Sequence, residues 1–258
     1  LNNGVQLVAF HPLILGTFQN RMEKMNFIVD LVVTRHLTTF THSVMVSYLA
    51  EAIGKHILAA RPELLRIPSS YLEGNVYASP AEVLDYIVPA ALFHDIGKNG
   101  MIPIINTQHR KLNDYEFNII QTHPQKGSDY LSSDPDFLIY QPVALGHHRS
   151  YDGTRGYPLS FDNTASPYRD AIDLIHICDC LDAATDYLSR NYHRAKPFDV
   201  VLNELKAGRG TEYNPDMVDV ILSDRELYND LKMLTEQNRE NIYYDIYLTF
   251  VNLRKKRQ

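Results

Sequence analysis

Apolar residues recur at helical spacing along most of the chain. One series, with members separated by three, four and four residues, consists of Val46, Leu49, Ile53 and Ile57. This spacing places all four side chains on one face of a helix. Sustained alternation of polar and apolar residues, which would indicate strands, is absent except for a weak candidate near residues 6–10. The pattern therefore predicts an all-α protein.

Five further segments have the same helical pattern. They cover residues 79–98, 112–131, 167–189, 198–206 and 225–255. The first opens with Ser79 and Glu82, which together form a signal for a helix cap. The second has Asn113 or Asp114 as its N-cap, and we expect Pro124 to end it. Loops are expected near residues 61–80, 99–113, 149–167 and 207–215.

Composition limits the classes of function. The 258 residues are 45% hydrophobic and 22% charged, as in an ordinary globular protein. The net charge of −6 argues against binding to a nucleic-acid polymer. No stretch approaches the roughly 18 uninterrupted apolar residues of a membrane span, because His11 and Pro12 interrupt the apolar N-terminal segment. Cys178 and Cys180 point to different sides of a helix, which favours a reduced, cytoplasmic setting.

Candidate metal ligands begin with an adjacent imidazole and carboxylate, His94 and Asp95, followed one turn later by Lys98. Such a pair can hold one divalent ion, and the second carboxylate oxygen can reach another. A buried, hydrogen-bonded pair explains the dipeptide equally well. His42 begins the apolar helix described above and could face this pair. Asp179 lies among apolar residues, where a carboxylate is costly to bury unless it is paired or bound to metal.

Three more histidines extend the series. His123 precedes a proline, and His147 and His148 are adjacent just before a glycine-rich loop. Taken singly, each fits an ordinary surface or capping residue. Five histidines and two aspartates in one ordered series fit that interpretation less well. We interpret Asp182, three residues after Asp179, as a hydrogen-bond acceptor or a surface charge rather than a ligand.

Apart from His42, the candidate ligands lie in four motifs that follow one another along the chain. These are HDIGK (94–98), THPQKG (122–127), HHRSYDGTRGYP (147–158) and ICDCLDA (177–183). The combination resembles the HD-GYP domain, the branch of the HD superfamily whose members hydrolyse cyclic dinucleotides, chiefly cyclic di-GMP. The resemblance covers residues 38–222 and implies an HD-type helical bundle with a metal centre in its core. Residues 1–37 are then a linker or the remnant of a preceding region, and residues 223–258 are a C-terminal helical extension.

Carried over by position, the resemblance implies a set of metal ligands, namely His42, His94, Asp95, His123, His147, His148 and Asp179. It implies catalytic roles for Asp95 and Lys98. The residues that it implies for substrate binding are Lys98, Gly156, Tyr157, Pro158, Arg190 and Arg194.

Two positions depart from the family pattern. Arg149 follows the paired histidines where most members have Glu. That Glu is not an obligatory ligand, so we interpret the change as tuning, with loss of activity as the alternative. Thr38 lies four residues before His42, where members with three metals have Glu. Because threonine is a poor ligand, we predict two divalent metal ions. Imidazole and carboxylate ligands favour Fe or Mn and leave Zn, Ni and Co open.

We therefore predict a metal-dependent phosphodiesterase that hydrolyses cyclic di-GMP to pGpG, with slow or no cleavage onward to GMP, by a hydroxide bridging the two ions. Two alternatives remain open. A catalytically weak cyclic-dinucleotide sensor would explain Arg149. A mononuclear HD nucleotidase would leave His123, His147 and His148 without a task. Because the chain begins with Leu1, we expect a region upstream, for which a sensory role is open. A homodimer and a preference for cyclic GMP-AMP are also open.

Overall fold

The computed structural model describes residues 16–69, 76–101, 111–188 and 194–255. Within these ranges the chain forms helices and loops, with three isolated bridges and no β-strand. The prediction of an all-α fold is therefore confirmed. The weak strand candidate near residues 6–10 lies outside the described residues. Among the described helices, none combines the length and the apolar character needed to cross a membrane.

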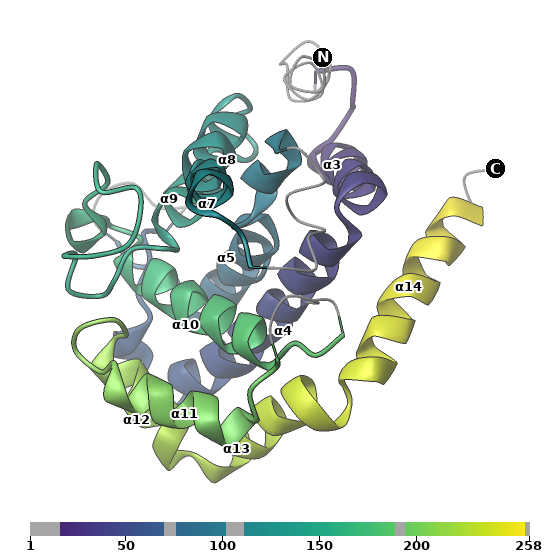
Figure 1. The fold of residues 1–258 in the computed structure, drawn as a ribbon. Helices are drawn as coiled ribbons and strands as arrows, with labels where there is room; N and C mark the ends of the chain where they lie inside the picture. The colour runs from purple at the N-terminus through teal and green to yellow at the C-terminus, as the bar shows by residue number, and fades with distance from the viewer. Residues whose placement is uncertain (1–15, 70–75, 102–110, 189–193, 256–258) are drawn as a thin grey trace.

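The elements follow one another along the chain as shown in Figure 1. The α-helices are α3 (Arg21–Arg35), α4 (Leu37–Ala60), α5 (Pro80–Phe93), α7 (Asp114–Ile120), α8 (His123–Ser132), α9 (Gln141–Gly146), α10 (Arg169–Thr185), α11 (Phe198–Ala207), α12 (Pro215–Ser223), α13 (Arg225–Lys232) and α14 (Arg239–Lys255). The 3-10 turns are η1 (Pro62–Leu64), η2 (Ile96–Gly100), η3 (Leu138–Tyr140) and η4 (Asn163–Ala165), and η5 (Met233–Gln237) is a π-helix.

Helix α4 runs through the centre of the bundle, with α5 and α10 packed against it (Figure 1). Its predicted apolar face, Val46, Leu49, Ile53 and Ile57, is fully buried. The buried core continues without a break from Ile28 in α3 to Leu231 in α13. Because His42 lies on the same helix near its beginning, the core itself fixes the position of this imidazole.

Local signals explain where the helices start. The Ser79 hydroxyl accepts from the Glu82 amide while the Glu82 carboxylate accepts from the Ser79 amide, so the predicted capping box is confirmed. The expectation that Pro124 ends the helix of segment 112–131 is wrong. The segment forms two helices, α7 and α8, and Pro124 lies in the first turn of α8. A proline fits there because that turn has no intrahelical partner for its N–H.

The predicted C-terminal helix of residues 225–255 is three consecutive elements, α13, η5 and α14. Leu227 and Leu231 of α13 belong to the main core. At the first half of α14, Tyr243 and Ile246 form a small apolar cluster with Met45 of α4. Farther along, α14 extends away from the body of the molecule (Figure 1).

Gly97 brings η2 into direct contact with the backbone of α8. A Cβ atom at Gly97 would overlap the carbonyl oxygen of His123 and would lie 2.5 Å from the amide nitrogen of Gly127. A residue with a side chain would therefore push the two elements apart. Since Asp95 directly precedes η2 and His123 begins α8, this close approach brings the two side chains together.

We expect Gly97→Ala to lower the free energy of unfolding by about 1–3 kcal/mol, as overpacking does. Gly127→Ala is the matched control, because a Cβ there would have its nearest neighbour at 3.3 Å and should cost clearly less. Urea unfolding of both variants checks the difference. Equal losses would contradict the proposed backbone contact.

Candidate metal centre

The structure brings all seven predicted ligands together. They come from α4 (His42), the end of α5 (His94 and Asp95), the start of α8 (His123), the end of α9 (His147 and His148) and the middle of α10 (Asp179). Most of them stand at a helix terminus, where the chain changes direction and can aim a side chain inward. They form two groups. One consists of His42, His94 and Asp179, and the other consists of Asp95, His123, His147 and His148. Within each group the candidate ligand atoms lie within 4.8 Å of one another.

Asp95 connects the two groups, because its two carboxylate oxygens face opposite ways. Oδ1 lies 3.1 Å from Nε2 of His123 and 3.7 Å from Nε2 of His147. Oδ2 lies 3.6 Å from Nε2 of both His42 and His94. A carboxylate in this arrangement can bind one ion through each oxygen, as the sequence predicts.

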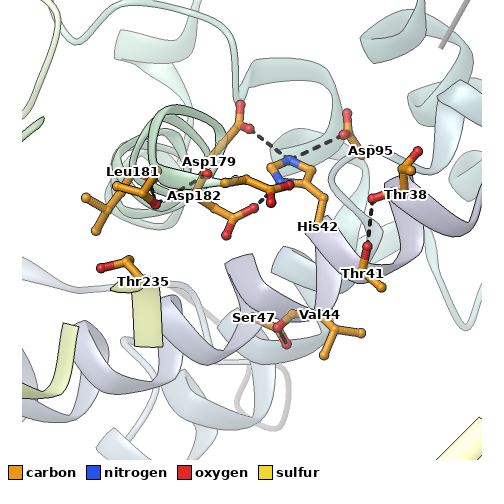
Figure 2. Close-up of polar contacts among 12 residues, drawn as sticks. Thr38, Thr41, His42, Val44, Ser47, Asp95, Asp179, Leu181, Asp182 and Thr235 are labelled. Carbon is orange, nitrogen blue, oxygen red and sulfur yellow. Dashed lines mark hydrogen bonds and ion pairs between the residues drawn. The ribbon is translucent and has the colours of Figure 1, made fainter. Parts of the chain in front are cut away.

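Asp179 has the same arrangement from the other side. Its Oδ1 lies 3.0 Å from Nε2 of His42, and its Oδ2 lies 3.6 Å from Nδ1 of His148. Figure 2 shows the His42 ring between Asp179 and Asp95 at one edge and Asp182 at the other. Two carboxylates therefore span the space between the two groups of histidines.

Hydrogen bonds fix which ring nitrogen faces the cluster in four of the five histidines. The Nδ1 atoms of three rings lie 2.6, 2.7 and 2.9 Å from the carbonyl oxygen three residues earlier, in the pairs His94–Ala91, His123–Ile120 and His147–Ala144. In these three rings Nδ1–H donates, so Nε2 is the nitrogen that can bind a metal. Nδ1 of His42 lies 2.6 Å from Oδ2 of Asp182, which confirms Asp182 as a hydrogen-bond acceptor and turns Nε2 of His42 towards the cluster.

Burial keeps the imidazoles of His94, His123 and His148 neutral. It lowers the pKa of His94 to about 3 and that of His123 to about 4, and it also lowers the pKa of His148 well below its usual value. Nε2 of His94 is buried and has no hydrogen-bond partner among the described residues. A buried polar atom of this kind is costly unless something binds it.

Both carboxylates remain ionised despite their burial. Burial alone would raise the pKa of Asp95, but the Lys98 ammonium and the surrounding imidazoles hold it well below its usual value. The pKa of Asp179 is likewise held low, against the effect of burial, by the hydrogen bond with His42 and by the nearby imidazoles. Neutral imidazoles and ionised carboxylates are the forms in which these side chains bind divalent ions. The residues therefore fit two divalent metals.

Lys98 and the loop after His148 border the cluster. The Lys98 side chain is 17% exposed, and its ammonium pairs with Oδ2 of Asp95. The ring of Tyr157 lies 4.6 Å from that of His148, centroid to centroid. Gly156 has φ +86°, and a Cβ there would overlap the carbonyl oxygen of His148. Only glycine lets this loop lie directly on the ligand-bearing backbone.

The structure gives less direct support for the remaining residues that were predicted to bind substrate. Pro158 is half-buried next to Tyr157. Arg194 is exposed in the segment between α10 and α11, and its contact with substrate stays a prediction. Arg190 lies outside the described residues.

Arg149 turns away from the ligands and into its own loop. It is buried, and its guanidinium donates to the carbonyl oxygens of Gly153, Arg155 and Gly156, the last two at 2.8 and 3.4 Å. The substitution that sets this chain apart from the family pattern therefore closes the glycine-containing loop and replaces none of the seven candidate ligands.

Two supporting residues were missed from the sequence. The Nδ1–H of buried His176 donates to the carbonyl oxygen of His147 at 2.7 Å, and its Nε2 lies 3.2 Å from Oε1 of Glu212. His176 stands three residues before Asp179 on the same helix, which was the available signal. The second missed residue is Arg239, which pairs with Asp182, the partner of His42. No motif in the sequence gives a signal for it.

The fold and the cluster together define a helical domain built around a candidate metal centre. The model of the HD domain family matches residues 39–191, more than half of the chain. The chain belongs to the HD domain family, as the motifs of the sequence predicted.

The chain shares modest sequence identity with individual relatives, 25–33% in three examples. The chain is 26% identical over 210 residues to a cyclic di-GMP phosphodiesterase of Vibrio cholerae, covering 77% of this chain and 41% of that protein. It is 33% identical over 146 residues to the cyclic di-GMP phosphodiesterase response regulator RpfG of Xanthomonas campestris, covering 56% and 37%. It is 25% identical over 203 residues to the 3'3'-cGAMP-specific phosphodiesterase 2 of Vibrio cholerae, covering 78% and 37%. The chain thus spans about two fifths of the length of these curated relatives.

We expect Asp95→Asn to remove both ions, because each group depends on one oxygen of this carboxylate. His147→Ala should reduce the metal content only towards one ion per chain. Asp173→Asn is the matched control, a buried aspartate of α10 that accepts from Asn214 instead. Metal analysis after anaerobic purification checks all three variants. Two ions per chain in Asp95→Asn would contradict the shared carboxylate.

The metal-free protein should lose stability as the pH falls from about 6.5 to 4. In that window the unfolded chain binds protons at His94 and His123, whereas the folded chain does not, since their pKa values are about 3 and 4. The expected slope is at most about 1.4 kcal/mol per pH unit for each histidine. Urea unfolding between pH 7 and 4.5 measures it. His94→Gln should flatten the slope, and an unchanged slope in that variant would contradict the buried, neutral imidazole.

Proposed function

We propose that this protein is a metal-dependent phosphodiesterase that hydrolyses cyclic di-GMP to pGpG. The observation that carries the proposal is the pair of ligand groups joined by Asp95 and Asp179. The similarity to phosphodiesterases of cyclic dinucleotides supports the substrate class. A mononuclear nucleotidase is a weaker interpretation, because the second group would then have no task.

The seven ligands hold two divalent ions in this proposal. Imidazole nitrogens and carboxylate oxygens without thiolate favour Fe or Mn, with Zn, Ni and Co as less favoured choices. Two such ions, when bound, lower the pKa of a bound water and stabilise negative charge on phosphoryl oxygens. The four positive charges exceed the charge of the two carboxylates, so the centre attracts a phosphodiester anion.

The protein residues around the centre bind and orient the substrate. Lys98 stands partly exposed beside Asp95, where its ammonium can reach a phosphate oxygen and stabilise charge that develops there. Burial raises the pKa of the Tyr157 phenol, so this group stays protonated and can donate a hydrogen bond or stack on a base. Gly156 and Pro158 hold Tyr157 in that loop. Arg190 and Arg194 contribute positive charge towards the phosphates.

The wider organisation follows from the same proposal. Residues 38–222 form the HD-GYP catalytic domain, residues 1–37 are a linker or the remnant of a preceding region, and residues 223–258 form a helical extension. The protein acts in the bacterial cytoplasm in cyclic-dinucleotide signalling. Arg149, which holds loop carbonyls, is compatible with full activity and weakens the case for a sensor without turnover.

The product distribution is the sharpest test. One cleavage of cyclic di-GMP gives pGpG, whose terminal phosphate carries nearly two negative charges. A third ion would help to hold that phosphate, and Thr38 stands one turn before His42 in α4 (Figure 2) where three-metal members have Glu. We therefore expect pGpG to accumulate, with GMP formed slowly or not at all.

A chromatographic time course with the Mn²⁺- or Fe²⁺-loaded protein measures the two products, and cyclic GMP-AMP in a parallel reaction measures substrate preference. Thr38→Glu should speed the second cleavage. Leu37→Glu is the matched control, because Leu37 is the neighbouring residue and is exposed. Thr41 would not serve as a control, since it is fully buried. Rapid conversion to GMP would contradict the two-metal inference, and absence of turnover in the fully metal-loaded protein would favour the sensor.

A further inference from the structure

Arg239, the first residue of α14, carries a fully buried charge. Its Nη1 lies 2.8 Å from Oδ1 of Asp182 and 3.6 Å from Oδ1 of Asp186. Its Nη2 donates to Oγ1 of Thr185 at 2.9 Å, and its Nε donates to the carbonyl oxygen of Thr235 at 3.1 Å. A guanidinium is costly to bury unless its N–H groups are paired. These contacts therefore tie the start of α14 firmly to the end of α10.

One of these contacts leads to the candidate metal centre. Asp182 is fully buried and binds Arg239 through Oδ1 and Nδ1 of His42 through Oδ2, the latter at 2.6 Å. On the opposite side of the ring, Nε2 of His42 lies 3.0 Å from Oδ1 of Asp179. An ionised carboxylate can only accept a hydrogen bond, so Nδ1 of His42 carries a proton towards Asp182, and the ring is turned with Nε2 towards the metal group.

His42 differs in this respect from the histidines whose Nδ1 bonds to a backbone carbonyl, namely His94, His123 and His147. Each of those three rings is oriented by the turn of chain just before it. The orientation of His42 depends instead on a side chain of α10, which is held in turn by a side chain of α14. The family match ends at residue 191, well before Arg239.

We propose that Arg239 is a positioning residue for the metal group formed by His42, His94 and Asp179, which makes the C-terminal segment part of the metal centre. The proposal rests on the proposed two-metal function. Through the guanidinium, Asp182 is kept in place, and its hydrogen bond keeps the His42 ring in one orientation. A displacement of η5 or α14 then weakens metal binding by the group of His42, His94 and Asp179. It leaves the orientations of the His123 and His147 rings unchanged.

Calorimetric titration of the metal-free protein, residues 1–258, with Mn²⁺ tests the proposal. Arg239→Met and Asp182→Asn should each weaken one of the two binding steps by about 10- to 100-fold, the range typical of residues that orient a ligand. The double variant should bind no more weakly than Asp182→Asn alone, because both changes break the same link. Arg239→Lys should restore part of the affinity.

A second measurement does not depend on metal. NMR of the nitrogen-15-labelled, metal-free protein should show the proton on Nδ1 of His42 protected from exchange with solvent by its hydrogen bond to Asp182, and Arg239→Lys and Asp182→Asn should reduce this protection. These two variants also decide the matter if Arg239→Met fails to fold. Leu231→Ala is the stability control, because it opens a cavity in the same segment without touching Asp182.

Unchanged Mn²⁺ affinity and unchanged protection of the Nδ1 proton of His42 in folded Arg239 variants would overturn the proposal. So would a loss of affinity in Leu231→Ala equal to that in an Arg239 variant of the same melting temperature, since the effect would then be one of stability alone. A wild-type protein that binds no Mn²⁺ would contradict the proposed function instead, and the proton-exchange comparison would still decide the role of Arg239.

Discussion

Two ionised carboxylates, Asp95 and Asp179, lie buried at the centre of the bundle, and the arrangement around them serves to keep them charged. Transferring such a group out of water costs several kcal/mol even after the protein relaxes. The imidazoles of His94, His123 and His148 have lowered pKa values because they are buried, so they stabilise the carboxylates through hydrogen bonds and dipoles rather than through a full positive charge. Lys98 offsets part of the negative charge at Asp95. Divalent ions between the carboxylates would balance the remainder, and this balance makes a buried cluster of this composition physically reasonable.

Helix ends orient the rings at little cost. The last carbonyl groups of an α-helix have no intrahelical donor. The carbonyl oxygens of Ala91 in α5, Ile120 in α7 and Ala144 in α9 lie in such last turns and accept from the histidine three residues later. When a helix ends just before a ligand histidine, one hydrogen bond has two effects. It satisfies a carbonyl oxygen of the last turn, and it places the proton of the histidine ring on Nδ1. The short helices around the centre follow from this requirement.

Sequence reasoning brought together the residues that the structure places in the two ligand groups, because all of them except His42 lie in short motifs whose residues act from neighbouring positions. It predicted the buried face of α4 for a similar reason, since helical spacing is a local property. It failed at Pro124, because the apolar pattern continues across the break between α7 and α8 and does not record where one helix stops. It also failed at Arg239, whose partner Asp182 is 57 positions away (239 minus 182) in the numbering of the chain. Pairing over that distance is decided by tertiary packing, for which a single sequence carries no local signal.

Two buried arginines lie close to the candidate ligands, and neither is among the ligands itself. Arg149 holds the carbonyl oxygens of the loop that lies over His148, and Arg239 holds the carboxylate that orients His42. A buried guanidinium is costly unless its N–H groups are paired, and each of these two pairs with groups next to a ligand. In both places a residue outside the ligand set fixes the surroundings of a histidine, and the ligand atoms themselves are left for the metal.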